Sequence, residues 1–184
     1  LSAVGYYAEG ENDEYSHKKA DDFLGGLCEK WENEAKGVEG CGIRCANMRF
    51  GIVIGKNGGA LSQMLPPFRA GLGGRIGSGK QGFSWIHISD LAGAIEFLID
   101  KSSSGAFNFT APNPTTNKGL TEALGRALHR PTLFPVPEFA LRLLYSEGAK
   151  VLTSGQKVYP KRLLEEGFEF SYQNIYDAVK DAIL

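Results

Sequence analysis

The sequence of 184 residues predicts an α/β fold. Short apolar runs rich in β-branched residues, which are typical of strands, alternate with longer segments whose apolar residues recur every three or four positions, as on one face of a helix. Polar or glycine-rich turns separate these segments. Such an alternation is typical of parallel strands joined by helices that pack on the sheet.

The first part of the chain predicts a strand, a loop and a helix, in that order. Residues 1–5 have the character of the end of a buried strand, and the charged segment 8–20 is expected to be a surface loop. From Asp21 onward the spacing of apolar residues predicts an amphipathic helix, with Trp31 in the core. The residues predicted to share its inward face are Phe23, Leu24, Leu27, Cys28, Trp31 and Ala35.

A second strand and helix are expected next. Residues 43–54 are apolar and β-branched, which predicts a strand. Residues 59–70 predict a helix, and Pro66-Pro67 is expected to break or kink it because proline lacks the backbone N–H. Gly71 to Gly82 contains six glycines and is therefore expected to be an irregular, ligand-facing loop.

Two further strand–helix pairs follow. Residues 83–88 predict a strand, after which Ser89 or Asp90 is expected to cap a helix. Residues 106–110 predict a short strand, and Thr116 is expected to cap a helix that ends before Pro131. The residues predicted to face inward from the two helices are Leu91, Ala94, Ile95, Leu98 and Ile99, then Leu120, Ala123, Leu124, Ala127 and Leu128.

Beyond Pro131 the chain predicts short helices punctuated by proline. Pro137 fits the first turn of one helix, Pro160 the start of a second that Gly167 stops, and a third begins near Ser171. Their predicted inward residues are Phe139, Leu143 and Leu144, then Leu163 and Leu164, then Ile175, Ala178 and Val179. We therefore divide the chain into residues 1–130 and a smaller, mostly helical region, 131–184.

Composition excludes several classes of partner. With 20 basic and 21 acidic residues the net charge is -1, so no positive field attracts nucleic acid or an anionic membrane. No apolar run approaches the roughly 20 residues of a membrane span, and the amino terminus has no signal-peptide pattern. We expect a cytoplasmic protein. Cys28, Cys41 and Cys45 lack the spacing and the histidine partners of a zinc site, which predicts buried, reduced thiols and no metal.

One glycine-rich segment imitates two phosphate-binding motifs. Residues 74–80 match the first seven places of a P-loop, but Gln81 stands where Ser or Thr would bind magnesium. Residues 77–82 also spell Gly-x-Gly-x-x-Gly, the dinucleotide fingerprint. Both motifs need a strand before them and a helix after them, and here the predicted order is the reverse. We therefore expect neither nucleotide hydrolysis nor a phosphate-binding role for Lys80.

Four consecutive motifs carry a family resemblance. They are Arg49-Phe50-Gly51-Ile52-Val53-Ile54-Gly55, Gly58-Gly59-Ala60-Leu61, Gly77-Ser78-Gly79-Lys80-Gln81 and Trp85-Ile86-His87-Ile88-Ser89-Asp90-Leu91-Ala92. With these motifs the chain resembles the second half of an extended short-chain dehydrogenase/reductase. The closest likeness is the atypical epimerase family, nucleotide-sugar-epimerase-like proteins with an added carboxyl-terminal domain. The resemblance implies a partial NAD(P)-binding Rossmann fold, preceded in the parent protein by on the order of 100 residues that form three or four βα units.

The resemblance also implies a cofactor, NADP or NAD, and residues that contact it. Residues 2–7 resemble the segment beside the nicotinamide, which makes Ser2 and Ala3 candidate cofactor-binding residues. Arg49-x-Gly51-x-Val53 is similar to the family loop whose backbone reaches the carboxamide, so Gly51, Ile52 and Val53 are candidates as well. An ordinary strand end is the alternative for that loop. Because the phosphate-cradling loop would lie outside this sequence, we expect the chain alone to bind the cofactor weakly.

The usual catalytic pair of these reductases, Tyr-x-x-x-Lys, is missing. The segment that should hold it, residues 22–28, contains neither tyrosine nor lysine, which leaves the catalytic residue unknown, with Tyr6 as a candidate. Gln81, Trp85 and His87 are candidate substrate-binding residues, each with a structural role as the alternative. Phe83 stands where nucleotide-sugar epimerases place an arginine for the diphosphate, which favours a neutral or weakly charged ligand.

Two functions follow from this interpretation. The first is an NAD(P)-dependent oxidoreductase or epimerase-like protein acting on an unidentified small molecule. The second is a non-catalytic NADP-binding or regulatory protein that retains the fold. No nucleic acid or membrane partner is expected, and a homodimer is left open.

Overall fold

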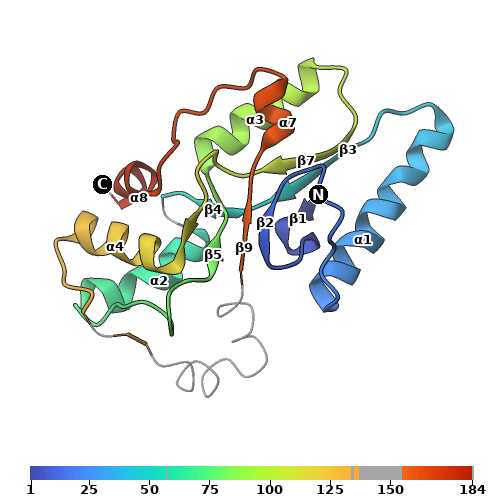
Figure 1. The fold of residues 1–184 in the computed structure, drawn as a ribbon. Coiled ribbons are helices and arrows are strands. Elements are labelled where there is room, and N and C mark those ends of the chain that lie inside the picture. The colour runs from blue at the N-terminus through green and yellow to red at the C-terminus, as the bar shows by residue number, and fades with distance from the viewer. Residues whose placement is uncertain (57, 134, 137–154, 184) are drawn as a thin grey trace.

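A computed structural model describes residues 1–56, 58–133, 135–136 and 155–183. A three-stranded parallel sheet forms its centre, in the order β1 (Ser2–Ala3), β3 (Ala46–Phe50) and β7 (Gly105–Phe109). Figure 1 shows this sheet between helix α1 (Phe23–Lys36) on one side and a group of helices on the other. The fold is α/β and matches the predicted class.

Gly51 divides the predicted strand 43–54 into two. Before it β3 pairs with β7, and after it β4 (Ile52–Ile54) pairs in parallel with β6 (Trp85–His87). The backbone therefore changes partners at a single residue. A strand was expected here, but the change of partner was not, because the apolar pattern continues through residue 51.

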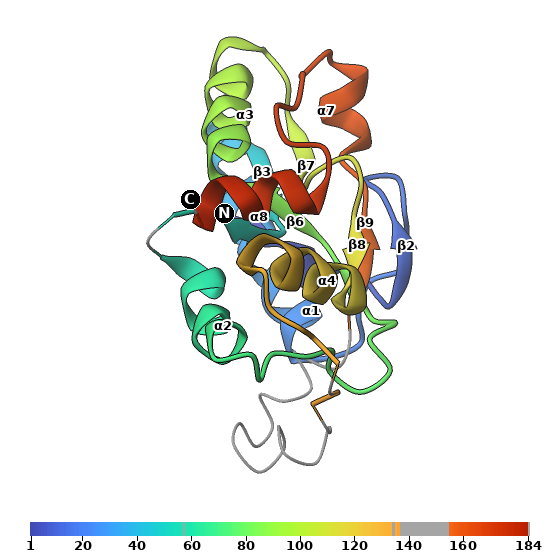
Figure 2. The ribbon, with the colours of Figure 1, turned by 90° about the vertical axis from the view of Figure 1, so that its left-hand side faces the viewer.

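Two small sheets lie beside the main one. Strand β2 (Gly10–Asn12) pairs in parallel with β9 (Gln156–Val158), and β5 (Gly82–Phe83) pairs antiparallel with β8 (Thr115–Thr116). Figure 2 shows β2, β8 and β9 side by side at one edge of the molecule. Segment 8–20 is thus not only a loop, and β9 joins the carboxyl-terminal part of the chain to the first residues.

In the described part of the chain, five α-helices besides α1 follow the predicted order. They are α2 (Gly59–Arg69), α3 (Ile88–Asp100), α4 (Asn117–Leu128) and, after β9, α7 (Lys161–Glu165), and the last helix is α8 (Ile175–Ile183). One 3₁₀ turn, Val4–Tyr6, follows β1, and another, Gly37–Cys41, follows α1. Pro160 precedes α7 and Gly167, with φ of 90°, follows it, as predicted. The helix predicted at Pro137 lies outside the described residues.

Helix caps were predicted with mixed success. The Thr116 side chain accepts a hydrogen bond from the Gly119 N–H at 3.2 Å, which confirms that cap. The cap of α3 is His87, whose Nδ1 accepts from the Ser89 N–H at 3.3 Å, so neither Ser89 nor Asp90 has the predicted role. Asp90 is buried and instead accepts from the backbone N–H groups of Ser171 and Tyr172, both at 2.9 Å.

The prolines in α2 do not end it. Pro66 and Pro67 lie inside the helix, which continues to Arg69, and the carbonyl of Pro66 still accepts from the Ala70 N–H at 3.1 Å. The predicted break is therefore wrong, and the alternative of a kink stays a prediction. Each proline costs the helix one N–H donor, but Leu65 and Phe68 are buried on either side of the pair and hold this turn against the core.

The inward face predicted for α1 is right at Cys28, which is buried, and wrong at Phe23 and Trp31. Gly25, Cys28 and Glu32 are its buried residues, whereas Phe23 is 80% exposed and Trp31 is 49% exposed. The expectation for the thiols holds for Cys28 and Cys45, which are buried, but not for Cys41, which is exposed. No group of residues suited to a metal ion occurs in the described part of the chain.

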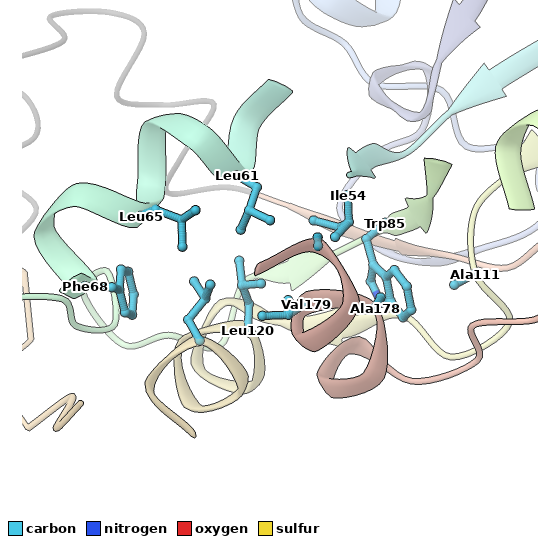
Figure 3. Close-up of a cluster of buried hydrophobic side chains, with 11 residues drawn as sticks. Ile54, Leu61, Leu65, Phe68, Trp85, Ala111, Leu120, Ala178 and Val179 are labelled. Carbon is cyan, nitrogen blue, oxygen red and sulfur yellow. The ribbon is translucent and has the colours of Figure 1, made fainter. Parts of the chain in front are cut away.

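Two hydrophobic clusters form the core. The first packs α2, α4 and α8 against β4 and β6, and Figure 3 shows its side chains converging from these elements. The second packs α3 and α7 against β3 and β7. Leu61, Leu124 and Val179 belong to the first cluster, so the described end of the chain shares a core with its middle. The domain boundary at residues 130 and 131 stays a prediction. Among the described helices, none has the length and apolar character needed to cross a membrane.

Candidate functional site

The structure brings the candidate cofactor-binding residues to one edge of the sheet. Ser2 lies opposite Arg49 and Ala3 opposite Phe50 in the β1–β3 register. Because the two strands are parallel, Val4 and Gly51 follow at the same carboxyl edge. Ligands of open parallel sheets bind outside this edge, so we take it as the candidate cofactor site.

Gly51 is needed at this edge for a reason internal to the fold. A Cβ at this position would lie 2.9 Å from the Ser84 carbonyl oxygen and 3.0 Å from Cγ2 of Thr110. The Gly51 N–H donates to the Phe109 carbonyl at 3.0 Å. We expected the missing side chain of Gly51 to let a ligand approach its backbone. Ser84 and Thr110 occupy that space instead. A large side chain here would disturb the fold itself.

Val53 offers its main chain at an edge of β4 that faces away from β6. The Ile52 N–H donates to the Ser84 carbonyl at 2.8 Å, which places Ile52 in the ladder with β6. In a parallel ladder alternate residues bond to the same neighbour, so the N–H and C=O of Val53 point the other way. No other strand of the described part of the chain pairs with that edge. A ligand could take these two groups without displacing a strand.

Behind this edge lies a buried ion pair that sequence reasoning missed. Glu32 accepts two hydrogen bonds from Arg49, from Nε and from Nη2, each at 2.7 Å, and a third from Oγ of Ser2 at 2.8 Å. Both charged side chains are at most 7% exposed. Two parallel bonds fix the guanidinium geometry, and the Ser2 bond ties β1 to helix α1. Ser2 is therefore held by the protein through its hydroxyl.

The network continues from Arg49 to Tyr7. Nη1 of Arg49 donates to the Tyr7 hydroxyl at 2.7 Å, and that hydroxyl donates to Oδ1 of Asn108 at 2.9 Å. Burial raises the pKa of Tyr7 above its ordinary value, although Arg49 acts in the opposite direction. Burial alone would lower the pKa of Arg49, but its bonds to Glu32 and Tyr7 raise it overall. At neutral pH Tyr7 is thus a neutral phenol and Arg49 a cation.

Tyr6, the candidate catalytic residue, packs under the same guanidinium. Cζ of Arg49 lies 3.6 Å from the centre of the Tyr6 ring, a cation–π contact, and the Tyr6 and Tyr7 rings meet edge to face at 5.3 Å. Tyr6 is partly exposed and Tyr7 is buried. Of these two tyrosines, Tyr6 is the one that solvent or a ligand reaches.

The three candidate substrate-binding residues do not lie together. Trp85 is fully buried in the first hydrophobic cluster, and its Nε1 donates to the Asn113 carbonyl at 3.3 Å. His87 is 2% exposed, stacks on Tyr172 at 3.8 Å between ring centres, and has Nε2 3.3 Å from Asp181 Oδ2 without a hydrogen bond. Both side chains serve the core in this structure, and their contact with substrate stays a prediction.

Gln81 lies at a cavity. The cavity has a volume of about 430 Å³ and is lined by Glu9, Gly10, Glu11, Ser78, Lys80, Gln81, Gly82, Gly155 and Lys157. The glycine-rich segment that contributes Ser78 to Gly82 lies between α2 and β5, the order in which neither phosphate-binding motif functions. The prediction of an irregular loop at 71–82 is confirmed up to Gly82, which begins β5.

Some of the missed residues had a signal in the sequence. Glu32 follows Cys28 by four positions and therefore shares its helix face. A carboxylate buried on that face needs a cationic partner. Tyr7 and Asn108 had no such signal, because 101 positions separate them. Lys157 was missed because β9 is only three residues long.

Comparison with known proteins gives one domain match and several long relatives. Residues 136–182 match a family model described as "Domain of unknown function (DUF1731)". The chain is 44% identical over 182 residues to the epimerase family protein SDR39U1 homolog, chloroplastic, of Arabidopsis thaliana, a match that covers 97% of the chain and 52% of that protein. It is 42% identical over 188 residues to epimerase family protein SDR39U1 of Mus musculus, which covers 100% of the chain and 64% of that protein.

A solved structure is similar as well. The crystal structure of human epimerase family protein SDR39U1 (isoform 2) with NADPH is 38% identical and superimposes with a TM-score of 0.92, over 98% of this chain and 63% of that one. The chain thus spans between about half and two thirds of the relatives that it matches.

Proposed function

Because the chain belongs to the epimerase family of extended short-chain dehydrogenases/reductases and includes the DUF1731 segment, we propose that its protein binds NADP(H) and acts as an epimerase-like oxidoreductase on a small molecule. The observation that carries the proposal is the junction of β1 and β3, where Val4 and Gly51 follow two parallel strands beside the main chain of Val53, whose N–H and C=O point away from β6. The NADPH in the human relative supports NADP over NAD.

The residues at this edge suit a nicotinamide in two respects. A carboxamide needs one acceptor and one donor in a plane, and the N–H and C=O of Val53 supply both from one residue. The Glu32–Arg49 pair and Tyr7 fix the backbone of residues 2–7 from behind, so that the edge is rigid before a ligand arrives. Bound NADP(H) would supply the hydride.

Acid–base chemistry has one candidate at this edge. Tyr6 is the partly exposed tyrosine here, and the Arg49 guanidinium packs on its ring, which fixes the position of the phenol. Tyr7 is unsuited, because its hydroxyl already bonds to both Arg49 and Asn108 in the interior. We propose Tyr6 as the proton donor if the protein turns over substrate.

A second function is a non-catalytic NADP-binding or regulatory protein. The observation that favours it is helix α1, which has neither tyrosine nor lysine among residues 22–28, where the usual pair would stand. Turnover separates the two functions. NADPH binding without oxidation of NADPH in a screen of carbonyl compounds supports the second, and a Tyr6-dependent turnover supports the first.

The test of cofactor binding uses two substitutions at one position. Val53→Pro removes the outward N–H while β4 keeps its ladder to β6, because that N–H does not belong to the ladder. Val53→Ala shortens the side chain but keeps the N–H. We expect NADPH titration of the intact protein, followed by fluorescence, to show roughly tenfold weaker binding for Val53→Pro and near-normal binding for Val53→Ala.

Circular dichroism serves as the control for folding. Equal affinities of the two folded variants would remove the Val53 main chain from the site. Absence of NADPH binding by the unsubstituted protein would overturn the proposed function as a whole.

A further inference from the structure

The cavity beside Gln81 is built from three separate parts of the chain. Glu9 to Glu11 belong to or adjoin β2, Ser78 to Gly82 form the glycine-rich loop, and Gly155 and Lys157 belong to or adjoin β9. The last two lie within residues 136–182, the segment matched by the domain of unknown function. Figure 1 shows β2 and β9 side by side.

Close backbone contacts fix the part of the cavity wall that β9 contributes. A Cβ on Gly155 would lie 2.1 Å from the Gly82 carbonyl oxygen, and a Cβ on Gly82 would lie 2.6 Å from the Gln156 carbonyl carbon. Ser84 clamps the same strand, because its Oγ donates to the Gln156 carbonyl at 2.7 Å and accepts from the Val158 N–H at 2.9 Å. The cavity wall is therefore a packed structure and not an accidental gap between loops.

Two connections place this cavity next to the candidate cofactor edge. The side-chain amide of Gln156 donates to the carbonyl of Val4, the residue that follows β1. Ser84, two residues after the lining residue Gly82, accepts the Ile52 N–H through its carbonyl. The lining residues Gly155 and Gly82 are thus at most two sequence positions from Gln156 and Ser84, which bond to residues at the candidate cofactor edge.

The lining chemistry restricts the ligand. In the described part of the chain every lining residue is polar or glycine, and the formal charges of its two glutamates and two lysines cancel. Lys157 is 3.5 Å from Glu11, with side-chain exposures of 35% and 66%. Carboxylates accept hydrogen bonds and ammonium groups donate them, and a hydroxyl group can satisfy both. The volume lies near the lower end of the roughly 300–1,000 Å³ of small-molecule sites.

We propose that this cavity is the substrate pocket, that β9 of the DUF1731 segment completes it by contributing Lys157, and that it takes a small, uncharged, polyhydroxylated molecule. The assignment as a substrate pocket rests on the proposed function, since a substrate must lie beside the cofactor edge. The segment of unknown function thereby acquires a role in ligand recognition. A charged diphosphate does not suit a lining in which the glutamates equal the lysines in number and Lys157 is paired with Glu11.

The test is a titration of the intact protein followed by backbone amide NMR shifts, with sorbitol, gluconate and inorganic phosphate as probes. We expect sorbitol to give saturable shifts at residues 79–82 and 155–157, and gluconate and phosphate to give smaller ones. Lys157→Met keeps the aliphatic stem and removes the donor, so it should raise the sorbitol concentration for half-saturation roughly tenfold. Lys30→Met, an exposed lysine on α1, is the matched control and should change nothing.

Lys80→Met is a second variant on the opposite wall and should also weaken sorbitol binding. Stronger shifts with phosphate or gluconate than with sorbitol would overturn the ligand class. Absence of shifts at both segments with all three probes would overturn the pocket. A parallel NADPH titration separates these failures from failure of the proposed function: NADPH shifts at residues 2–7 and 51–53 without sorbitol shifts at the cavity would leave only the cofactor proposal standing.

Discussion

The Glu32–Arg49 pair lies at the centre of the polar network behind the candidate site. It is bidentate, almost fully buried, and shared with Ser2 and Tyr7. Desolvation makes such a pair a poor source of net stability, but removing one partner leaves the other charge uncompensated. The pair therefore selects one arrangement of β1, α1 and β3 over others, and this arrangement carries the candidate cofactor edge.

Glu32→Ala is accordingly expected to destabilise the protein by roughly 3–5 kcal/mol, because Arg49 stays charged in the interior without its partner. Urea unfolding at neutral pH measures the change. Glu34→Ala, at an exposed position of the same helix, should stay within about 0.5 kcal/mol of the unsubstituted protein. If the two variants lose the same stability, the buried pair does not have this role.

Tyr7 gives a prediction with a pH dependence. Tyr7→Phe removes a hydroxyl with two partners and should cost about 1–3 kcal/mol at neutral pH. Burial raises the pKa of Tyr7 in the folded protein above its unfolded value of 10.0. Above pH 10 the unfolded state loses this proton and the folded state keeps it, so the stability due to Tyr7 is complete below pH 10 and decreases as the pH rises through the folded pKa.

The difference in unfolding free energy between the protein and Tyr7→Phe should therefore be constant between pH 7 and pH 9 and shrink above pH 10. Denaturant titrations across that range test it. A difference that grows as the pH rises towards 10 and levels off above it would mean that the folded pKa lies below 10 and that Arg49 outweighs burial.

At the scale of single elements, helix α1 shows how packing selects one face of a helix. Its sequence offers an apolar stripe through Phe23 and Trp31, yet the buried face contains Gly25, Cys28 and Glu32. Two contacts account for this choice: Gly25 approaches the Ala20 backbone too closely for any side chain, and Glu32 must reach Arg49. Helical periodicity predicts which residues share a face, but it cannot predict these two tertiary contacts.

Neighbouring glycines of α1 provide the matched test. A Cβ on Gly25 would lie 2.2 Å from the Ala20 carbonyl oxygen, whereas a Cβ on Gly26 would meet nothing within 4 Å. Gly26→Ala should stabilise the protein by about 0.5–1 kcal/mol through helix propensity. Gly25→Ala should destabilise it by roughly 1–3 kcal/mol through overpacking. Thermal unfolding of both variants measures this, and stabilisation by Gly25→Ala would show that α1 lies farther from residue 20.

At the scale of the whole molecule, the order and type of the long elements could be predicted from the sequence, and their pairing in space could not. The patterns around Thr116 and Leu124 gave α4 with its cap and its buried face. Strands β2 and β9 were missed because three residues are too few for a periodic signal, and they pair across more than 140 positions.

The candidate site, too, could be predicted from the sequence only in part. Gly51 and Val53 were predicted from a local motif, and the structure gives Gly51 an additional, internal reason. The cavity could not be predicted, because its lysines come from segments 77 positions apart in the chain, at residues 80 and 157. The close contact of Gly82 with Gly155 and the hydrogen bonds of Ser84 to β9 bring them to one place.

Whether residues 131–184 form a separate domain is a question about cooperativity. Val179 of α8 is fully buried in the cluster that also contains Trp85 and Leu61, and this implies a single unit that unfolds in one transition. Val179→Ala should then lower the urea midpoint seen by the fluorescence of buried Trp85 and the midpoint seen by far-ultraviolet circular dichroism by the same amount, with a loss of about 2 kcal/mol. Lys180→Ala, at an exposed position of the same helix, should change neither midpoint.

If Val179→Ala creates an early transition visible only by circular dichroism, the carboxyl-terminal region unfolds on its own. The predicted boundary would then separate two folding units, and the wall that β9 gives to the cavity would depend on a part of the chain that can detach from the rest.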